Sequence, residues 1–210
     1  GGPPILMSRG NHDVRGPVAN RVAAYTDFPG GRPYYSFRIG PVGAVVLDTG
    51  EDKPDDHPSF LGLVNFAELI REQAAWLARE IEQPHLKSAP YRLVFCHIPL
   101  RWKDEFVPTY DAAGGSYDHW SGRGRKAWHD SLVRWGAQMV ISGHTHDWHH
   151  MPATPEFPYA QLVGGGPVLD ESKGQAILIR AHATAKTLTF SLRNAATGRE
   201  VFTTALAPRA

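Results

Sequence analysis

The sequence predicts an α/β sandwich with a largely antiparallel end, and three observations support this fold class. Short continuous apolar runs, typical of buried strands, recur along the chain and end in glycine-containing or polar loops. Two segments between these runs carry the periodicity of helices. After residue 174 three alternating runs follow one another with no helical segment between them. Strands that first alternate with helices and then continue alone are typical of this architecture.

The first half of the chain predicts three strands and one helix. Residues 4–8, PILMS, form a short apolar run before a glycine loop and predict a buried strand. Residues 34–40 and 42–48 predict a strand pair. A capping-box pattern at 65–68 predicts a helix that continues to about residue 82. The apolar residues that share one face of this helix are Phe66, Ile70, Leu77 and Ile81.

The second half continues the alternation and then ends in strands. Residues 91–98 predict a buried strand, and residues 101–122, which lack any period, predict a long functional loop. A helix over 125–135 and a buried strand over 137–142 follow. The alternating runs GQAILIRA, TLTFSLR and EVFTTAL predict a meander within 174–206.

The gross composition is typical of one globular domain. We expect a single domain over 1–210, with a motif-bearing core at 4–165 and the β meander at 174–206. The formal net charge of +1 gives no sign of a nucleic-acid surface. The apolar runs are far shorter than the roughly 20 residues that span a bilayer. Cys96 is the only cysteine, which excludes an internal disulfide.

Four of the eleven histidines stand where an apolar strand run has just ended: His12, His97, His144 and His146. Strand ends form the rim on which sites are built in such folds. Neutral imidazoles together with an amide oxygen, such as that of Asn11, suit divalent ions including Zn, Fe and Mn. The sequence therefore predicts a metal site at this rim.

The motifs GNHD at 10–13, FCHIPL around His97 and GHTH at 143–146 occur in the order seen in calcineurin-like metallophosphoesterases. The chain resembles the purple-acid-phosphatase-like branch of that superfamily over residues 4 to about 165. The resemblance implies a two-sheet sandwich flanked by helices. It also implies hydrolysis of phosphate esters at a pair of metal ions (Fe, Zn or Mn) through a metal-bridging hydroxide.

The resemblance assigns a role to each motif residue. Asn11, His97 and His144 would bind one metal, and His146 would bind the other. His12 would act as a general acid on the leaving oxygen. Asp13 would accept a hydrogen bond from His12 and keep it cationic.

The chain departs from the family pattern at the first two motifs, which carry the bridging carboxylates. It contains no Gly-Asp dipeptide, and the Asp-x-His at Asp55–His57 lies in a polar loop that follows GNHD. We therefore expect the C-terminal portion of a catalytic domain, incomplete at its N-terminal side, whose partner is the missing N-terminal segment. Such a chain would bind at most one ion and hydrolyse its substrate poorly. The alternative is a non-catalytic binding module that keeps the fold and a single metal half-site.

The loop 101–122 offers cations and aromatic rings for a small phosphate ester. Its candidate substrate-binding residues are Arg101, Trp102, Tyr110 and His119. Asp48, in an Asp-Thr-Gly triplet that suggests an aspartic protease, is expected only to end a core strand, because that chemistry needs two carboxylates. Relatives of this branch are often exported, which favours an exported or periplasmic location. The choice between monoester and diester substrates stays open.

Overall fold

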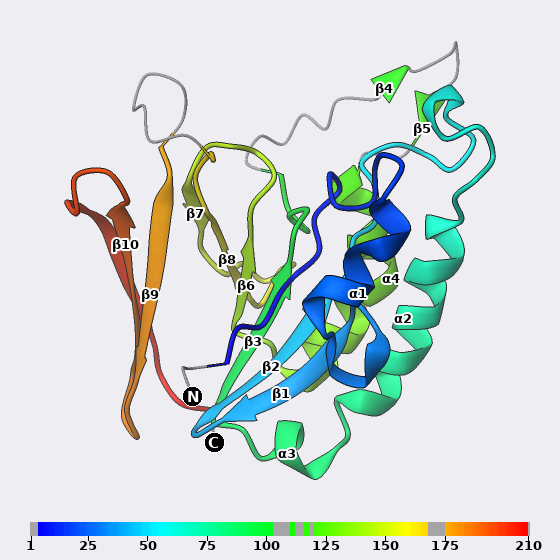
Figure 1. Cartoon of the computed structure of the whole chain (residues 1–210). Coiled ribbons are helices and arrows are strands. Elements are labelled where there is room, and N and C mark those ends of the chain that lie inside the picture. The colour runs from blue at the N-terminus through cyan, green and yellow to red at the C-terminus, as the bar shows by residue number, and fades with distance from the viewer. Residues whose placement is uncertain (1–3, 103–109, 112–115, 118–119, 168–174, 210) are drawn as a thin grey trace.

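A computed structural model describes residues 4–102, 110–111, 116–117, 120–167 and 175–209 (Figure 1). The strands are β1 (Tyr35–Ile39), β2 (Val42–Leu47), β3 (Tyr91–Cys96), β4 (Tyr110–Asp111), β5 (Ser116–Tyr117), β6 (Met139–Ser142), β7 (His149–Met151), β8 (Ala160–Val163), β9 (Ile177–Ala183), β10 (Leu188–Asn194) and β11 (Glu200–Leu206). The α-helices are α1 (Val22–Thr26), α2 (Phe66–Glu80), α3 (Pro84–Lys87) and α4 (Trp120–Trp135). Short 3₁₀ turns occupy Ala19–Arg21, Pro29–Gly31 and Pro58–Phe60.

A mixed six-stranded sheet forms the centre of the fold, in the order β1-β2-β3-β6-β8-β7. The four inner strands β2, β3, β6 and β8 run parallel, and the two edge strands β1 and β7 run antiparallel to their neighbours. The parallel strands are short and almost wholly buried, which explains why their sequences are continuous apolar runs. Their carboxyl ends all lie at one edge of the sheet.

Helices α2 and α4 cover one face of this sheet (Figure 1). The predicted capping box begins α2, because the Asn65 side chain accepts a hydrogen bond from the Glu68 amide at 3.2 Å. Helix α4 starts at Trp120, earlier than the predicted helix at 125–135. Gly122 and Gly124 are poor helix formers and hide the periodicity of its first turn. The predicted loop at 101–122 therefore ends sooner and includes the short strands β4 and β5.

The antiparallel sheet β11-β10-β9 packs on the opposite face of the central sheet. Leu188, Phe190 and Leu192 of β10 are buried, and they meet the central sheet at Leu93 and Leu162. This arrangement confirms the predicted meander and the α/β class. The central sheet is thus packed by helices on one side and by a second sheet on the other.

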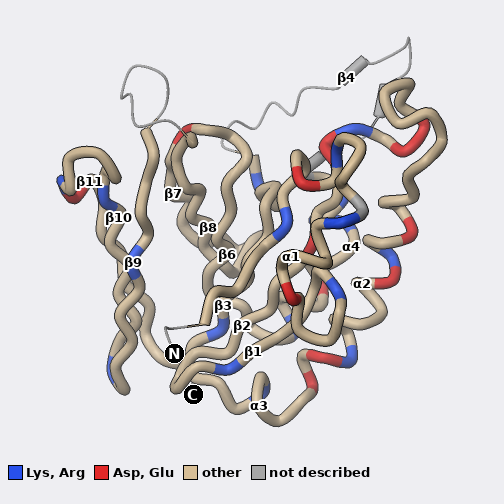
Figure 2. Tube along the Cα trace, in the orientation of Figure 1, with Lys and Arg blue, Asp and Glu red and all other residues tan. Residues whose placement is uncertain are grey.

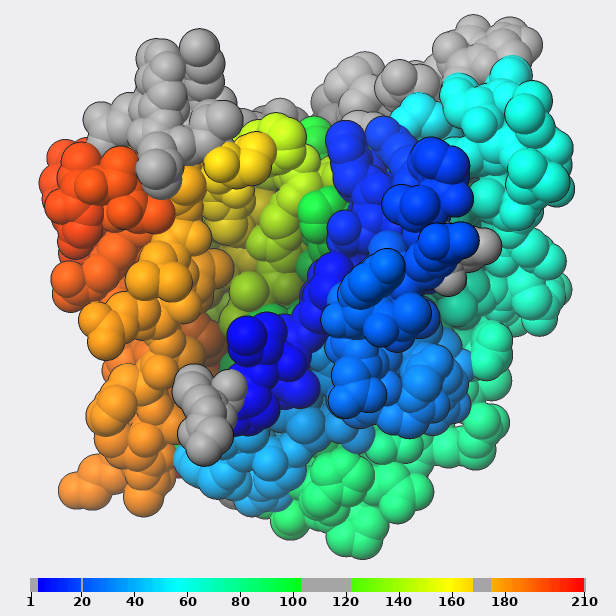
Figure 3. Space-filling model, in the orientation of Figure 1, coloured from blue at the N-terminus to red at the C-terminus, as the bar shows by residue number. Residues whose placement is uncertain are grey.

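The prediction of a buried strand at residues 4–8 is wrong. Ile5 is 93% exposed and Leu6 is 39% exposed, and the segment lies as an irregular trace on the surface, blue in Figure 3. A strand needs a hydrogen-bonded neighbour, and the described residues provide none beside this segment. It is held instead by a hydrogen bond of 2.9 Å from the Tyr35 hydroxyl to the Met7 carbonyl.

Charged residues gather on the helices and on the loops at the sheet edge, whereas the strands are mostly uncharged (Figure 2). None of the helices in the described ranges is long and apolar enough to span a bilayer. The charged loops at the carboxyl ends of the parallel strands hold the candidate site.

Candidate metal centre

Five segments that are distant in sequence meet at the carboxyl edge of the sheet. They are the loop after the N-terminal segment, the loop after β2, the residue after β3, the turn after β6 and the loop after β8. Together they enclose a cavity of about 580 Å³. The residues that line it are Ser8, Gly10, Asn11, His12, Asp13, Asp52, His97, His144, His146 and Pro167. The structure thus brings all six sequence-predicted catalytic and metal-binding residues into one cavity.

Asn11 and His97 form the innermost pair of the site. The Oδ1 atom of Asn11 lies 2.9 Å from Nε2 of His97, and Asn11 is only 1% exposed. The amide nitrogen of Asn11 donates to Glu51 Oε1 and to Asp52 Oδ2, each at 3.2 Å. The carbonyl oxygen of Asn11 therefore faces the His97 imidazole.

His97 is held tightly by the backbone around it. A Cβ atom at Gly10 would lie 3.2 Å from the His97 ring, so the loop passes closer to the ring than a side chain would comfortably allow. Burial lowers the pKa of His97, although the Asp13 carboxylate opposes the shift. The ring is therefore neutral near physiological pH, the form in which imidazole binds metal ions.

His144 and His146 lie in a strained turn directly after β6. Their φ angles are +72° and +59°, in the left-handed region that non-glycine residues rarely adopt. The His144 ring packs edge-on against His97 with ring centroids 5.3 Å apart. Burial, then the neighbouring His97, lowers the pKa of His144 to about 4. His146 is exposed at the mouth of the same cavity.

His12 and Asp13 do not pair with each other as the resemblance implied. The Asp13 carboxylate accepts a hydrogen bond of 2.8 Å from the Gly10 amide and so closes the GNHD turn. The exposed His12 ring lies instead 3.3 Å from the Arg15 guanidinium, through its Nε2 atom. His12 is thus near the cavity but is oriented by a cation and not by Asp13.

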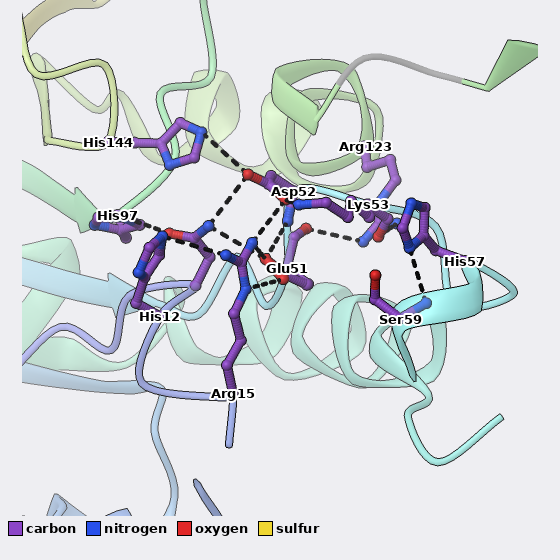
Figure 4. A network of polar contacts seen from close by, with 11 residues as sticks. His12, Arg15, Glu51, Asp52, Lys53, His57, Ser59, His97, Arg123 and His144 are labelled. Atoms are coloured by element: carbon purple, nitrogen blue, oxygen red, sulfur yellow. Dashed lines mark hydrogen bonds and ion pairs between the residues drawn. The ribbon is translucent and has the colours of Figure 1, made fainter. Parts of the chain in front are cut away.

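A charged network beside the cavity was not predicted as part of the site. Arg15 donates to Glu51 Oε2 at 2.7 Å and to Glu51 Oε1 at 2.5 Å, and it reaches Asp52 Oδ1 at 3.1 Å (Figure 4). Lys53 pairs with the same Asp52 oxygen at 2.5 Å. The acidic run directly after β2 is the sequence signal that could have identified this network, because parallel strands end at one edge of a sheet.

The donor atoms suit a divalent ion chemically. Two ligand atoms at right angles, each about 2.1 Å from one ion, lie about 3 Å apart. The Asn11–His97 distance of 2.9 Å matches that spacing. Asp52 Oδ2 lies 3.9 Å from His144 Nε2 and adds a carboxylate beside the imidazoles. Within the described ranges, however, no three His, Cys, Asp or Glu side chains are already arranged to hold an ion.

The loop residues predicted to bind substrate lie elsewhere or outside the described residues. Arg101 is 7% exposed, and its guanidinium donates to the Pro152 carbonyl at 2.9 Å and lies over the Phe157 ring. It does not line the cavity, and neither does Trp102. The side chain of Tyr110 and all of His119 fall outside the described residues.

Two carboxylates that suggested other chemistry have structural roles. Asp48 follows β2, is 1% exposed and accepts hydrogen bonds from Arg9 at 2.7 Å and from the Gly50 amide at 2.7 Å. Asp55 accepts from the Phe66 and Ala67 amides at 3.0 and 2.8 Å and so caps α2. Neither aspartate faces the cavity.

Comparison with known proteins places this site in a family. Serine/threonine-protein phosphatase CPPED1 of Homo sapiens is 29% identical over 145 residues, which is 68% of this chain and 41% of that protein. The Danio rerio protein of the same name is 27% identical over 146 residues, covering 68% and 42%. The chain thus spans about two fifths of the length of these curated relatives.

A solved structure supports the fold independently. Purple acid phosphatase PPD1 from yellow lupin (Lupinus luteus) superposes with a TM-score of 0.54 over 85% of this chain and 33% of that one, at 11% sequence identity. The family model for calcineurin-like phosphoesterases matches residues 2–148, the stretch that holds all three motifs. The chain therefore belongs to the calcineurin-like phosphoesterase family.

Proposed function

We propose that this chain carries one half of a metal-dependent phosphoesterase site, which acts on small phosphate esters. The observation that carries the proposal is the buried Asn11–His97 pair, with donor atoms 2.9 Å apart in a cavity that His144 and His146 also line. Asn11, His97 and His144 would hold one ion, and His146 would contribute to a second. Fe, Zn and Mn all suit this mixed nitrogen and oxygen donor set.

The protein side chains prepare this half-site in three ways. Burial keeps His97 and His144 neutral, so each ring can bind an ion through one nitrogen while its single proton lies on the other. The buried Asn11 amide presents a neutral oxygen, which adds no charge to the site. When bound, the metal pair supplies charge neutralisation at the phosphoryl group and an activated water for in-line attack.

His12 is the proposed general acid. It is an exposed imidazole of the cavity wall, so a leaving oxygen can approach it from solvent. The Arg15 guanidinium beside it contributes fixed positive charge next to the place where an anionic ester would bind. Asp13 supports this step indirectly, because its bond to the Gly10 amide fixes the turn from which His12 projects.

The other metal ligands are proposed to lie in a preceding segment of the same catalytic domain. The named relatives are more than twice the length that they share with this chain, and members of the family typically bind two metal ions. We therefore expect at most one tightly bound ion and weak hydrolysis from these 210 residues. The human relative is named a serine/threonine-protein phosphatase, which makes phosphomonoesters the first substrates to test.

A second candidate function is a non-catalytic binding module with a single metal half-site. The observation in its favour is that the chain contains no Gly-Asp dipeptide, which carries a bridging carboxylate in the family pattern. The placement of His12 on the cavity wall favours the enzyme, because a module that only binds needs no acid for a leaving group.

The deciding experiment measures metal stoichiometry and turnover on the purified chain. Mn, Zn and Fe are offered separately, and the variant His144→Ala serves as control. One ion per wild-type chain that is lost in the variant, with slow p-nitrophenyl phosphate hydrolysis, is the result we expect. Binding without any hydrolysis, even with the preceding segment supplied, would support the binding module. Metal content that is unchanged by His144→Ala would contradict both functions.

A further inference from the structure

We propose that Glu51 is the positioning residue of this site, which sets the orientation of the Asn11 amide and, through Arg15, the place of His12. The inference rests on the proposed function, since it concerns the same metal half-site. None of the family motifs in this chain includes Glu51, which lies in the loop after β2. Its side chain is nevertheless fully buried, and its carboxylate bonds to two of the groups that line or adjoin the cavity.

The first step is the orientation of Asn11. A carboxylate only accepts hydrogen bonds, so the end of the amide that faces Glu51 Oε1 must be the NH₂ group. The carbonyl oxygen is then forced to the opposite side, where it meets His97 at 2.9 Å. If the amide flipped, its NH₂ group would face the imidazole, and the half-site would lose its oxygen ligand.

The second step is the rigidity of Glu51 itself. Arg15 holds both carboxylate oxygens in a fork, through Nε to Oε2 and Nη2 to Oε1 at 2.7 and 2.5 Å. Bidentate pairs of this kind fix geometry as well as charge. The Arg123 guanidinium also reaches the Glu51 backbone carbonyl at 3.4 Å, which ties the loop to α4. Glu51 is therefore a fixed point and not a mobile surface acid.

The third step connects Glu51 to His12, the proposed general acid. The Arg15 guanidinium that grips Glu51 also lies 3.3 Å from Nε2 of His12. Glu51 thus orders the Asn11 oxygen, which would face the metal. Through Arg15 it also orders the His12 imidazole, which would face the leaving group. Asp52 shares the Asn11 contact but is partly exposed and is also engaged by Lys53, so it supplements Glu51 in this role.

The test is a double-mutant cycle on Mn²⁺ affinity, measured by calorimetry on the whole chain. Glu51→Met keeps the length of the side chain but removes both acceptor oxygens, so the Asn11 NH₂ group and Arg15 both lose their bonds to this side chain. We expect Mn²⁺ affinity to fall about 10- to 100-fold, as for other groups that orient metal ligands. In an Asn11→Ala background the same change should have no further effect, because the amide that it orients is gone. Glu80→Met, at a partly buried acid that accepts a hydrogen bond from Ser36, is the matched control and should leave affinity unchanged.

A loss in Glu51→Met that persists in full in the Asn11→Ala background would overturn the proposal, because Glu51 would then act only on overall structure. Unchanged affinity in Glu51→Met would overturn it equally.

A measurement on the wild-type chain keeps the proposal testable if the variant does not fold. The side-chain amide protons of Asn11 should exchange slowly with solvent in the NMR spectrum of the metal-free chain, as the Nδ2 bonds to Glu51 and Asp52 require. Rapid exchange, as for an exposed asparagine, would overturn the positioning role. This readout needs no metal, so it separates failure of the Glu51 inference from failure of the proposed function, which would appear as absence of Mn²⁺ binding.

Discussion

Strand β3 passes through two regions that are organised by different forces. Along the strand, Leu93, Val94 and Cys96 are buried in apolar cores on the two faces of the sheet. One residue later, His97 lies at a rim of imidazoles, carboxylates and guanidinium groups. The interior is stabilised by buried apolar area and close packing, and many combinations of apolar side chains can provide both. The rim is held by directed hydrogen bonds, which only particular atoms can make.

The two regions should therefore respond differently to substitution. A substitution in the interior should lower the free energy of unfolding and leave metal affinity unchanged. A substitution at the rim should lower metal affinity and leave the fold intact. Each prediction below tests that separation.

The largest effect is expected from Trp128→Ala in the helix-side core. Trp128 is fully buried on α4, so its removal should lower the free energy of unfolding by about 3–5 kcal/mol. Urea denaturation measures the change. Val133→Ala on the same helix, where the side chain is 38% exposed, is the control and should cost well under half as much. Equal costs would show that the interior is not closely packed.

A similarly large contrast is expected in the reactivity of Cys96, the residue directly before His97. Burial raises the pKa of the Cys96 thiol to about 12, and its sulfur lies 3.3 Å from the Ile98 carbonyl oxygen. Because the thiolate is the reactive form, a disulfide reagent should attack the native chain roughly a thousand-fold more slowly than the chain in guanidinium. Comparable rates in the two states would mean that the interior opens readily at this strand end.

At the rim, His144→Ala should lower Mn²⁺ affinity by about 100-fold, because it removes a proposed ligand and not a neighbour of one. Its free energy of unfolding should change by less than about 1 kcal/mol, because alanine carries a Cβ as histidine does and the backbone strain at φ +72° is retained. Calorimetry and urea denaturation together measure both quantities. His182→Ala, an exposed histidine of β9, should alter neither, and an equal affinity loss there would refute the assignment of His144.

The smallest effect is expected where the two regions meet, at the start of α2. Asn65→Ala removes the bond from the Glu68 amide and should cost about 1 kcal/mol of unfolding free energy. Asn65→Asp, which keeps the cap, should cost little. Mn²⁺ affinity should be unchanged in both variants, and a loss in either would show that the helix cap and the rim are coupled.

The sequence by itself determined most of the elements. Apolar runs predicted β2, β3 and β6, alternation predicted the three-stranded meander, and periodicity with the Asn65 cap predicted α2. These signals are local, since a strand or helix shows its buried face within a few residues. The GNHD, FCH and GHTH motifs marked the rim histidines for the same reason. The exception is the segment 4–8, whose apolar pattern predicted a strand although strand formation depends on a neighbour that the described chain does not supply.

Only the tertiary structure decided which residues of the rim bond to one another. Asn11 meets a carboxylate 40 residues away and an imidazole 86 residues away, and no local pattern encodes such distances. It showed that the Asn11 amide donates to Glu51, that the Arg15 guanidinium lies beside His12, and that Arg101 bonds to the Pro152 carbonyl in the interior. The physical reason is that burial is a property of a residue and its near neighbours, whereas a hydrogen bond at a strand end is a property of two loops that the whole sheet must first bring together.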